Sequence, residues 1–185
     1  KKLIAEQISV YLRTNIVKAE KFSEILKSSL NAYLNGMITN EAVIEELLNL
    51  AKQITKSQNE GEELGLTADE LAFYDALTKP QAIKDFYENK ELIAITKELA
   101  DALRKNNTID WQKRESARAT MRMQIKRLLK KHRYPPEGME DAVQTVMTQC
   151  ELWTDNFDYS NDHYVLNDNS EKMIPLVAEE NEKYN

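Results

Sequence analysis

The chain has 185 residues, of which 42% are hydrophobic and 30% charged, with only four glycines and four prolines. Its net charge of −6 argues against a general polyanion-binding protein, and its single cysteine, Cys150, excludes an internal disulfide. The length allows one large domain or two small ones, and the composition favours long amphipathic helices.

The first residues predict neither a signal peptide nor a membrane span, because no apolar run approaches the ~20 residues that a span needs. The chain lacks an initiator Met and enters helical periodicity at once. We therefore expect a fragment of a longer polypeptide. A lone cysteine also fits a reducing, cytoplasmic compartment.

Residues 1–60 are predicted to form an N-terminal helical region. Apolar residues recur at helical spacing from Leu3 to Leu34, and Asn35-Gly36 ends this run. A second helix is expected to begin after Thr39 or Asn40, with an apolar face made of Val43, Ile44, Leu47, Leu48, Ala51 and Ile54. The polar segment from Lys56 to Gly65 holds two glycines, which predicts a break or a loop.

Residues 61–153 are predicted to form a C-terminal helical domain. Thr67 and Glu70 have the spacing of a capping box, and Leu66 and Leu71 occupy the hydrophobic-staple positions around it. This helix should stop before Pro80. Further helices are expected over 81–88 and 89–104, and a turn at 106–108.

The longest helix is predicted over 110–133, because Pro135-Pro136 ends the periodic pattern. A last helix should bury Met139, Val143, Val146, Cys150 and Trp153. After Thr154 the periodicity fades, so an extended, mostly non-helical C-terminal arm is expected over 154–185, packed on the helices. The predicted fold is thus all-α, an irregular multi-helix bundle with that arm.

The residues that catalysis and cofactor binding require are missing. No Gly precedes Lys and Ser or Thr as in a P-loop, and two histidines with one cysteine make a zinc site improbable. Asp85, Glu88 and Lys90 are similar to the carboxylate-and-lysine set of metal-dependent nucleases. That set belongs on adjacent strands, whereas a helix and its boundary are predicted here, so no catalytic, cofactor or metal residues are expected.

Segregated charge is the strongest feature besides periodicity. The segment from Trp111 to Arg133 contains nine basic residues and one acid, Glu115. Its net charge is therefore +8, and the remainder of the chain carries −14. The basic residues are Lys113, Arg114, Arg118, Arg122, Lys126, Arg127, Lys130, Lys131 and Arg133.

A projection at 100° per residue places Arg114 and Arg118 close to the apolar face of the helix 110–133. Both are therefore candidates for structural ion pairs, whereas Lys126 and Lys130 should point to solvent. The candidates for contact with a partner or with DNA are Arg122, Lys126, Arg127, Lys130, Lys131 and Arg133. Three interpretations stay open: a solvated face, a protein-binding surface, and contact with DNA phosphates. Trp111 and Trp153 are expected to be core anchors.

Two long blocks of this sequence resemble one family. Residues 62–77, EELGLTADELAFYDAL, resemble a stretch of the motor and nuclease (R) subunit of type I restriction enzymes. Asp110-Trp111, Arg114-Glu115, Arg118-Ala119, Arg122, Ile125 to Leu129 and Tyr134-Pro135-Pro136 resemble its C-terminal block. The region from Phe22 to Ile54 is similar too, so the resemblance covers roughly 18–153.

This resemblance implies that the chain is a non-catalytic C-terminal piece of a bacterial, cytoplasmic restriction endonuclease. In that family the nuclease and the ATP- and Mg-dependent, helicase-like motor lie elsewhere in the subunit. The resemblance further implies that this region docks the subunit onto the methyltransferase and specificity subunits. The alternative is an element that guides double-stranded DNA during translocation. No block of the family matches the segment after Thr154.

Overall fold

The computed structural model describes residues 2–106 and 111–161, and within these ranges the chain forms eight α-helices, a short 3-10 turn and no strand. The predicted all-α class is confirmed. The elements are α1 (Lys2–Thr14), α2 (Ile16–Leu34), α3 (Asn40–Leu64), α4 (Ala68–Leu77), α5 (Gln81–Phe86), α6 (Asn89–Asn106), η1 (Trp111–Lys113), α7 (Glu115–Lys131) and α8 (Pro136–Asn161).

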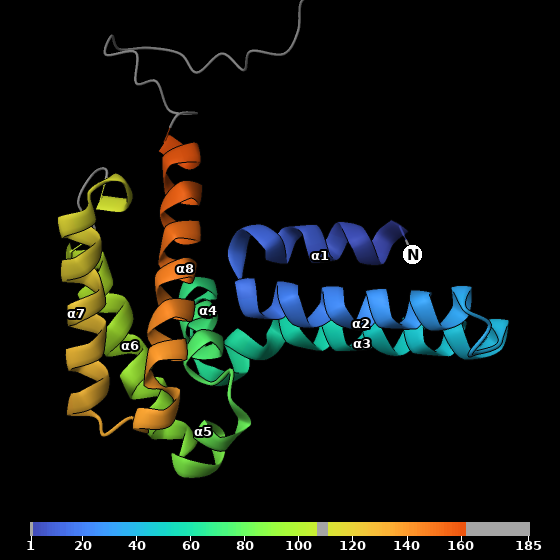
Figure 1. Ribbon diagram of the computed structural model, residues 1–185, viewed down its shortest axis with the longest axis horizontal. Coiled ribbons are helices and arrows are strands. Elements are labelled where there is room, and N and C mark those ends of the chain that lie inside the picture. The colour runs from blue at the N-terminus through green and yellow to red at the C-terminus, as the bar shows by residue number, and fades with distance from the viewer. Residues whose placement is uncertain (1, 107–110, 162–185) are drawn as a thin grey trace, which may run out of the picture.

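The helices form two parts that lie at a steep angle to each other (Figure 1). Helices α1, α2 and α3 lie side by side and project as a limb, residues 2–64. The remaining helices form the bundle, in which α4 contacts α6 and α8, and α7 contacts α6 and α8. None of the helices in the described ranges is long and apolar enough to cross a membrane.

The limb has its own small core, and its first helical run is interrupted. Phe22 and Leu50 are buried at its centre, and the Tyr11 and Phe22 rings lie 5.5 Å apart. The continuous run predicted from Leu3 to Leu34 is wrong at Asn15, whose backbone is extended. The Asn15 side chain accepts a hydrogen bond from the amide of Lys18 at 3.1 Å, so it caps α2 and the chain reverses direction there.

Helix α3 corrects a second prediction, because the segment expected to be a loop from Lys56 onward is helical as far as Leu64. Gly61 is buried inside the helix. A Cβ atom at this position would lie 3.1 Å from the Leu66 carbonyl oxygen, so the glycine allows a close approach. Of the two glycines in this segment, only Gly65, at φ 64°, has the left-handed backbone that ends a helix. Ile44 and Leu48, predicted to face the core, are 57% exposed.

Helix α4 is the central element of the bundle. Its predicted capping box is confirmed: the Glu70 amide donates to the Thr67 hydroxyl at 3.3 Å, and the Thr67 amide donates to the Glu70 carboxylate at 3.0 Å. Leu66 and Leu71 are buried, as the staple requires. Every residue from Leu71 to Leu77 is buried, because α4 is covered by α2, α6 and α8.

The bundle core extends from α4 to the start of the basic segment. Trp111 is 1% exposed, and its indole nitrogen donates to the Thr154 hydroxyl at 3.1 Å. Trp153 is half-buried, with its ring edge-on to Phe73 and its indole nitrogen 3.1 Å from an Asp69 carboxylate oxygen. The remaining buried apolar residues come mainly from α6, α7 and α8, among them Leu99, Leu103, Ile125, Leu129, Val143 and Met147.

Three predicted boundaries of the bundle are wrong. The helix expected from residue 110 begins at Glu115, because Trp111–Lys113 form a 3-10 turn that buries Trp111. The helix expected over 81–88 ends at Phe86. The extended arm was expected to begin at residue 154, but helix α8 continues to Asn161. The rest of the predicted arm, residues 162–185, and residues 107 and 108 of the predicted turn lie outside the described residues.

A buried polar joint fixes the limb to the bundle. Asn15 donates to the Asp75 carboxylate at 2.7 Å, and the Lys18 ammonium lies 3.6 Å from the same oxygen and 3.0 Å from Glu60. Gln149 of α8 accepts from the Ile16 amide at 3.0 Å and donates to the Thr14 carbonyl at 2.9 Å. These paired groups orient the limb more specifically than apolar contact alone.

Candidate docking surface

Helix α7 is held in the bundle by one apolar face. Met121, Ile125, Leu128 and Leu129 are buried against α6 and α8. The side of α7 turned away from the core is defined here as the outer face, and all of its residues are exposed. It consists of Ser116, Ala119, Thr120, Met123, Arg127 and Lys130, which recur at the three- and four-residue spacing of one helix face.

The basic residues flanking the outer face pair with carboxylates of neighbouring helices. Arg118 lies 2.5 Å from Glu151 of α8, half-buried on both sides. Lys126, predicted to point to solvent, lies 2.6 Å from Glu140 of α8. The hydrogen bond and charge of Lys126 lower the pKa of Glu140.

On the α6 side, one carboxylate serves two basic groups. Lys131 lies 2.6 Å from Glu98, and the His132 ring nitrogen lies 2.7 Å from the other oxygen of the same carboxylate. The hydrogen bonds from Lys131 and His132 lower the pKa of Glu98. The acidic remainder of the chain thus neutralises the two flanks of α7.

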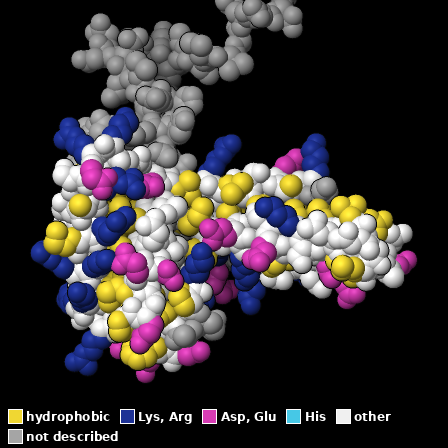
Figure 2. Space-filling model, viewed as in Figure 1, with side chains coloured by type: hydrophobic (Ala, Val, Ile, Leu, Met, Phe, Trp, Pro, Cys, Tyr) yellow, Lys and Arg dark blue, Asp and Glu magenta, His cyan; other side chains and the backbone are white. Residues whose placement is uncertain are grey.

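Three basic residues of α7 and its end are not neutralised in this way. Arg127, Lys130 and Arg133 are exposed, and no carboxylate in the described ranges lies within ion-pair distance of them. Arg133 follows α7 with a left-handed backbone, at φ 57°. Lys and Arg side chains gather along the edge of the bundle that α7 forms (Figure 2). The outer face therefore joins an exposed methionine, Met123 (48% exposed), to a patch of uncompensated positive charge.

Arg114 and Arg122 differ from the other basic residues. Arg114 is the exposed N-cap of α7, with an extended backbone, so it is not on the helix face that the sequence predicted. It has no ion pair with a residue that the structure describes. Arg122 is half-buried, and its Nε atom is buried without a hydrogen-bond partner in the described part of the chain. Its charge contributes to the lowered pKa of Glu140.

The nuclease-like set of acids does not assemble. Asp85 is exposed on α5, Glu88 precedes α6, and Lys90 is exposed on its first turn. The amide of Glu88 donates to the Glu91 carboxylate at 3.2 Å, an arrangement typical of a helix start. The described residues contain no group of three or more His, Cys, Asp or Glu side chains that could hold a metal ion.

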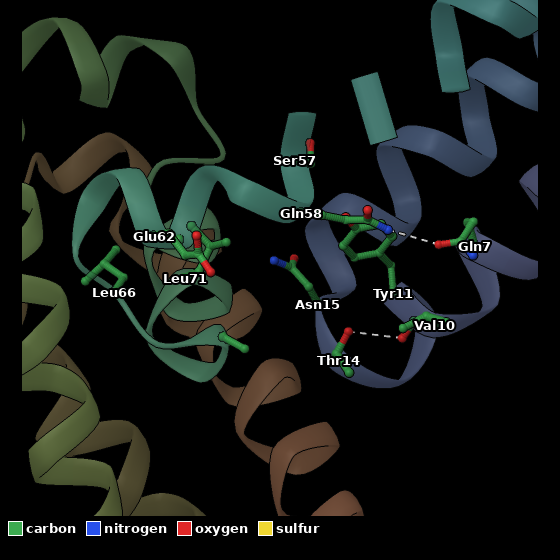
Figure 3. Close-up of a pocket in the computed structure, with 12 residues that line it drawn as sticks. Gln7, Val10, Tyr11, Thr14, Asn15, Ser57, Gln58, Glu62, Leu66 and Leu71 are labelled. Atoms are coloured by element: carbon green, nitrogen blue, oxygen red, sulfur yellow. Dashed lines mark hydrogen bonds between the residues drawn. The ribbon is translucent and has the colours of Figure 1, made fainter. Parts of the chain in front are cut away.

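A cleft of about 350 Å³ lies where the limb meets the bundle (Figure 3). Its polar groups are engaged with one another: Gln58 donates to Gln7 at 3.0 Å, and Thr14 donates to the Val10 carbonyl at 3.0 Å. Burial raises the pKa of the Tyr11 phenol, which donates to the Ile54 carbonyl at 3.5 Å. The cleft can supply hydrogen bonds but has no nucleophile paired with a base among these contacts.

Sequence reasoning missed the buried joint of Asn15, Lys18, Asp75 and Gln149. One signal was present: Asp75 interrupts the apolar run of α4, which a helix buried on all sides tolerates only with partners. Burial raises the pKa of Asp75 although Lys18 and Asn15 favour its ionised form. Lys18 and Gln149 gave no comparable signal, because their partners are remote in the sequence.

Comparison with known proteins gives one family and two relatives. Residues 1–156 match the family described as type I restriction enzyme HindI endonuclease subunit-like, C-terminal. The chain is 38% identical over 148 residues to the type I restriction enzyme HindI endonuclease subunit of Haemophilus influenzae, covering 80% of this chain and 14% of that protein. It is 34% identical over 166 residues to the putative type I restriction enzyme MjaIXP endonuclease subunit of Methanocaldococcus jannaschii, covering 89% of this chain and 15% of that protein. No solved structure matches it significantly.

Proposed function

Since this chain belongs to the family of C-terminal regions of HindI-like type I restriction endonuclease subunits, we propose that it is a docking module. It holds the endonuclease subunit on the methyltransferase core, with its specificity subunit, through the outer face of α7. The chain spans only about one seventh of the length of the curated relatives it matches. The ATP- and Mg-dependent motor and the nuclease are therefore assigned to the remainder of the parent subunit.

The observation that carries this proposal is the composition of the outer face. Its first half is small and uncharged, with Ser116, Ala119 and Thr120, which lets another surface approach the helix closely. Met123, an adaptable apolar side chain, lies at its middle, and Arg127 and Lys130 lie at its end. Protein interfaces are usually depleted in charge at their centre, enriched in Met and Arg, and polar at their rim, and the outer face agrees with this composition.

One observation favours a second function, the guiding of double-stranded DNA. Arg127, Lys130 and Arg133 lack carboxylate partners among the described residues, so they are available to phosphates. Phosphate contacts release counterions, and log K should then fall by about 0.9 per contact for each unit of log salt concentration. A docking face centred on Met123 should give a much weaker dependence on salt.

The test is the double variant Arg127→Glu/Lys130→Glu in the complete subunit. The matched control is Lys52→Glu/Lys56→Glu, which makes the same charge change at exposed positions of α3 in the limb. Docking predicts that only the first variant lowers the amount of assembled complex in native mass spectrometry. Normal assembly with less processive, more salt-sensitive translocation would favour the DNA function instead. Normal assembly and normal translocation would contradict both.

A further inference from the structure

We propose that the last residues of the chain, 162–185 (the tail), bind to the outer face of α7 in the isolated chain. The tail would thus occupy the surface for which we have proposed docking to other subunits. This binding concerns one chain only and does not rest on the proposed function.

The composition of the tail is the first argument. It contains six carboxylate side chains and two lysines, a net side-chain charge of −4. The family match ends at residue 156, so the tail lies outside the region that the family model matches. Its apolar residues are concentrated between residues 173 and 177, followed by an acidic stretch at 179–182. Those apolar residues are Met173, Ile174, Leu176 and Val177, and the acids are Glu179, Glu180 and Glu182.

Charge complementarity selects α7 among the surfaces that the structure describes. The segment from Trp111 to Arg133 carries +8, whereas the limb, residues 2–64, has nine acids against seven basic residues. An acidic tail is therefore repelled by the limb on average and attracted by α7. The flanks of α7 are neutralised by Glu98, Glu140 and Glu151. The attraction is consequently directed to Arg127, Lys130 and Arg133.

The position at which α8 ends makes the contact possible. About two to three turns before its end, Thr154 contacts Trp111 and Glu151 contacts Arg118, so this part of α8 lies beside η1 and the start of α7, and the last turns of α8 project beyond them (Figure 1). Helix α7 has 17 residues and is about 26 Å long. Eleven residues separate Asn161 from Met173, and the twelve steps between these two residues can span about 40 Å when extended, more than the length of α7.

The order of residues also agrees along the two segments. Moving along α7 away from the end of α8, the outer face presents Ala119 and Met123 first and Arg127 and Lys130 afterwards, and Arg133 follows just beyond the helix. From Met173 onward the tail has the same order, with the apolar residues 173–177 first and Glu179, Glu180 and Glu182 afterwards; its other three acids, Asp162, Asp168 and Glu171, precede this stretch. A tail that runs parallel to α7 can therefore place Ile174 near Met123 and Glu179 and Glu180 near Arg127 and Lys130.

The experiment is a paramagnetic NMR measurement on the 185-residue chain with a nitroxide attached at Ala178→Cys. Cys150 does not interfere, because it is buried and its environment raises the pKa of its thiol to about 12, so it is poorly reactive. The proposal predicts a loss of amide signal along α7 from Met123 to Arg133. The loss should disappear in Arg127→Glu/Lys130→Glu and should be retained in the control Lys52→Glu/Lys56→Glu.

Charge exchange completes the test. Adding Glu179→Lys/Glu180→Lys to the variant Arg127→Glu/Lys130→Glu reverses the charges of both the tail and α7. The loss of amide signal should then return. Signal loss centred on another surface, or loss that survives the reversal in α7, would overturn the proposal. Loss transferred from a labelled chain to a separate, unlabelled one would show that a second copy supplies the tail, and would also overturn it. Neither result bears on docking to other subunits.

Discussion

At the scale of single residues, the buried Lys18 decides how the limb is held. It contacts Asp75 and Glu60 with only 6% of its side chain exposed. Lys18→Met should lower the free energy of unfolding by about 3–5 kcal/mol, because it leaves the buried Asp75 carboxylate without a counter-charge. Chemical denaturation at neutral pH measures this cost.

The stability cost of Lys18→Met should depend on pH, in a direction set by the raised pKa of Asp75. Burial raises the pKa of Asp75, so this carboxyl becomes neutral at a higher pH than an ordinary one as the pH falls. The cost of Lys18→Met should therefore shrink on acidification, when Asp75 no longer needs a counter-charge. Asp75→Asn in the Lys18→Met background should recover part of the loss, since an amide oxygen still accepts from Asn15. A cost that grows toward acid pH would contradict this account of the joint.

Arg133 is a second residue with a testable energetic cost. Its left-handed backbone, φ 57°, favours glycine at this position after α7. Arg133→Gly should raise the free energy of unfolding by about 1 kcal/mol, because it removes that strain. Thermal denaturation measures the gain. An unchanged or lower stability would indicate that the Arg133 side chain makes stabilising contacts of its own.

At the scale of elements, short-range signals predicted structure well. The capping box of Thr67 and Glu70 involves residues three positions apart, so the sequence alone specifies it. Thr67→Ala should cost about 1 kcal/mol and leave the fold intact. Circular dichroism during urea unfolding tests both statements. A loss of helical signal in the absence of urea would mean that α4 depends on this cap more than we expect.

Elements determined by tertiary contacts were predicted less well. The segment 56–64 looks like a loop because it is polar and contains Gly61, yet it is helical because that glycine lets α3 approach Leu66 and Leu71. The interruption at Asn15 combines a local cap on the Lys18 amide with a hydrogen bond to Asp75, sixty positions away. Arg118 could be assigned an acidic partner from its place near the apolar face, but Lys126 could not. Its pairing with Glu140 requires the position of α8.

At the scale of the whole molecule, the structure consists of two parts, the limb and the bundle, each with its own core. The limb has its own core and is fixed at a set angle by the buried joint. The bundle presents the outer face of α7, remote from the limb (Figure 1). The limb exposes other apolar residues, including Leu34 (77%) and Leu48 (57%), and these give a matched comparison for the docking surface.

The central claim, that the outer face of α7 meets the methyltransferase core, is tested most directly by photo-crosslinking. The photoreactive residue p-benzoylphenylalanine replaces Met123 in the complete subunit and, as the comparison, Leu48 on the limb. Assembly with the methyltransferase and specificity subunits and with DNA precedes illumination, and mass spectrometry identifies the crosslinked partner. Our account predicts that position 123 crosslinks to a subunit of the core and that position 48 does not. A crosslink from position 123 to DNA alone, or to nothing while position 48 reaches the core, would contradict it.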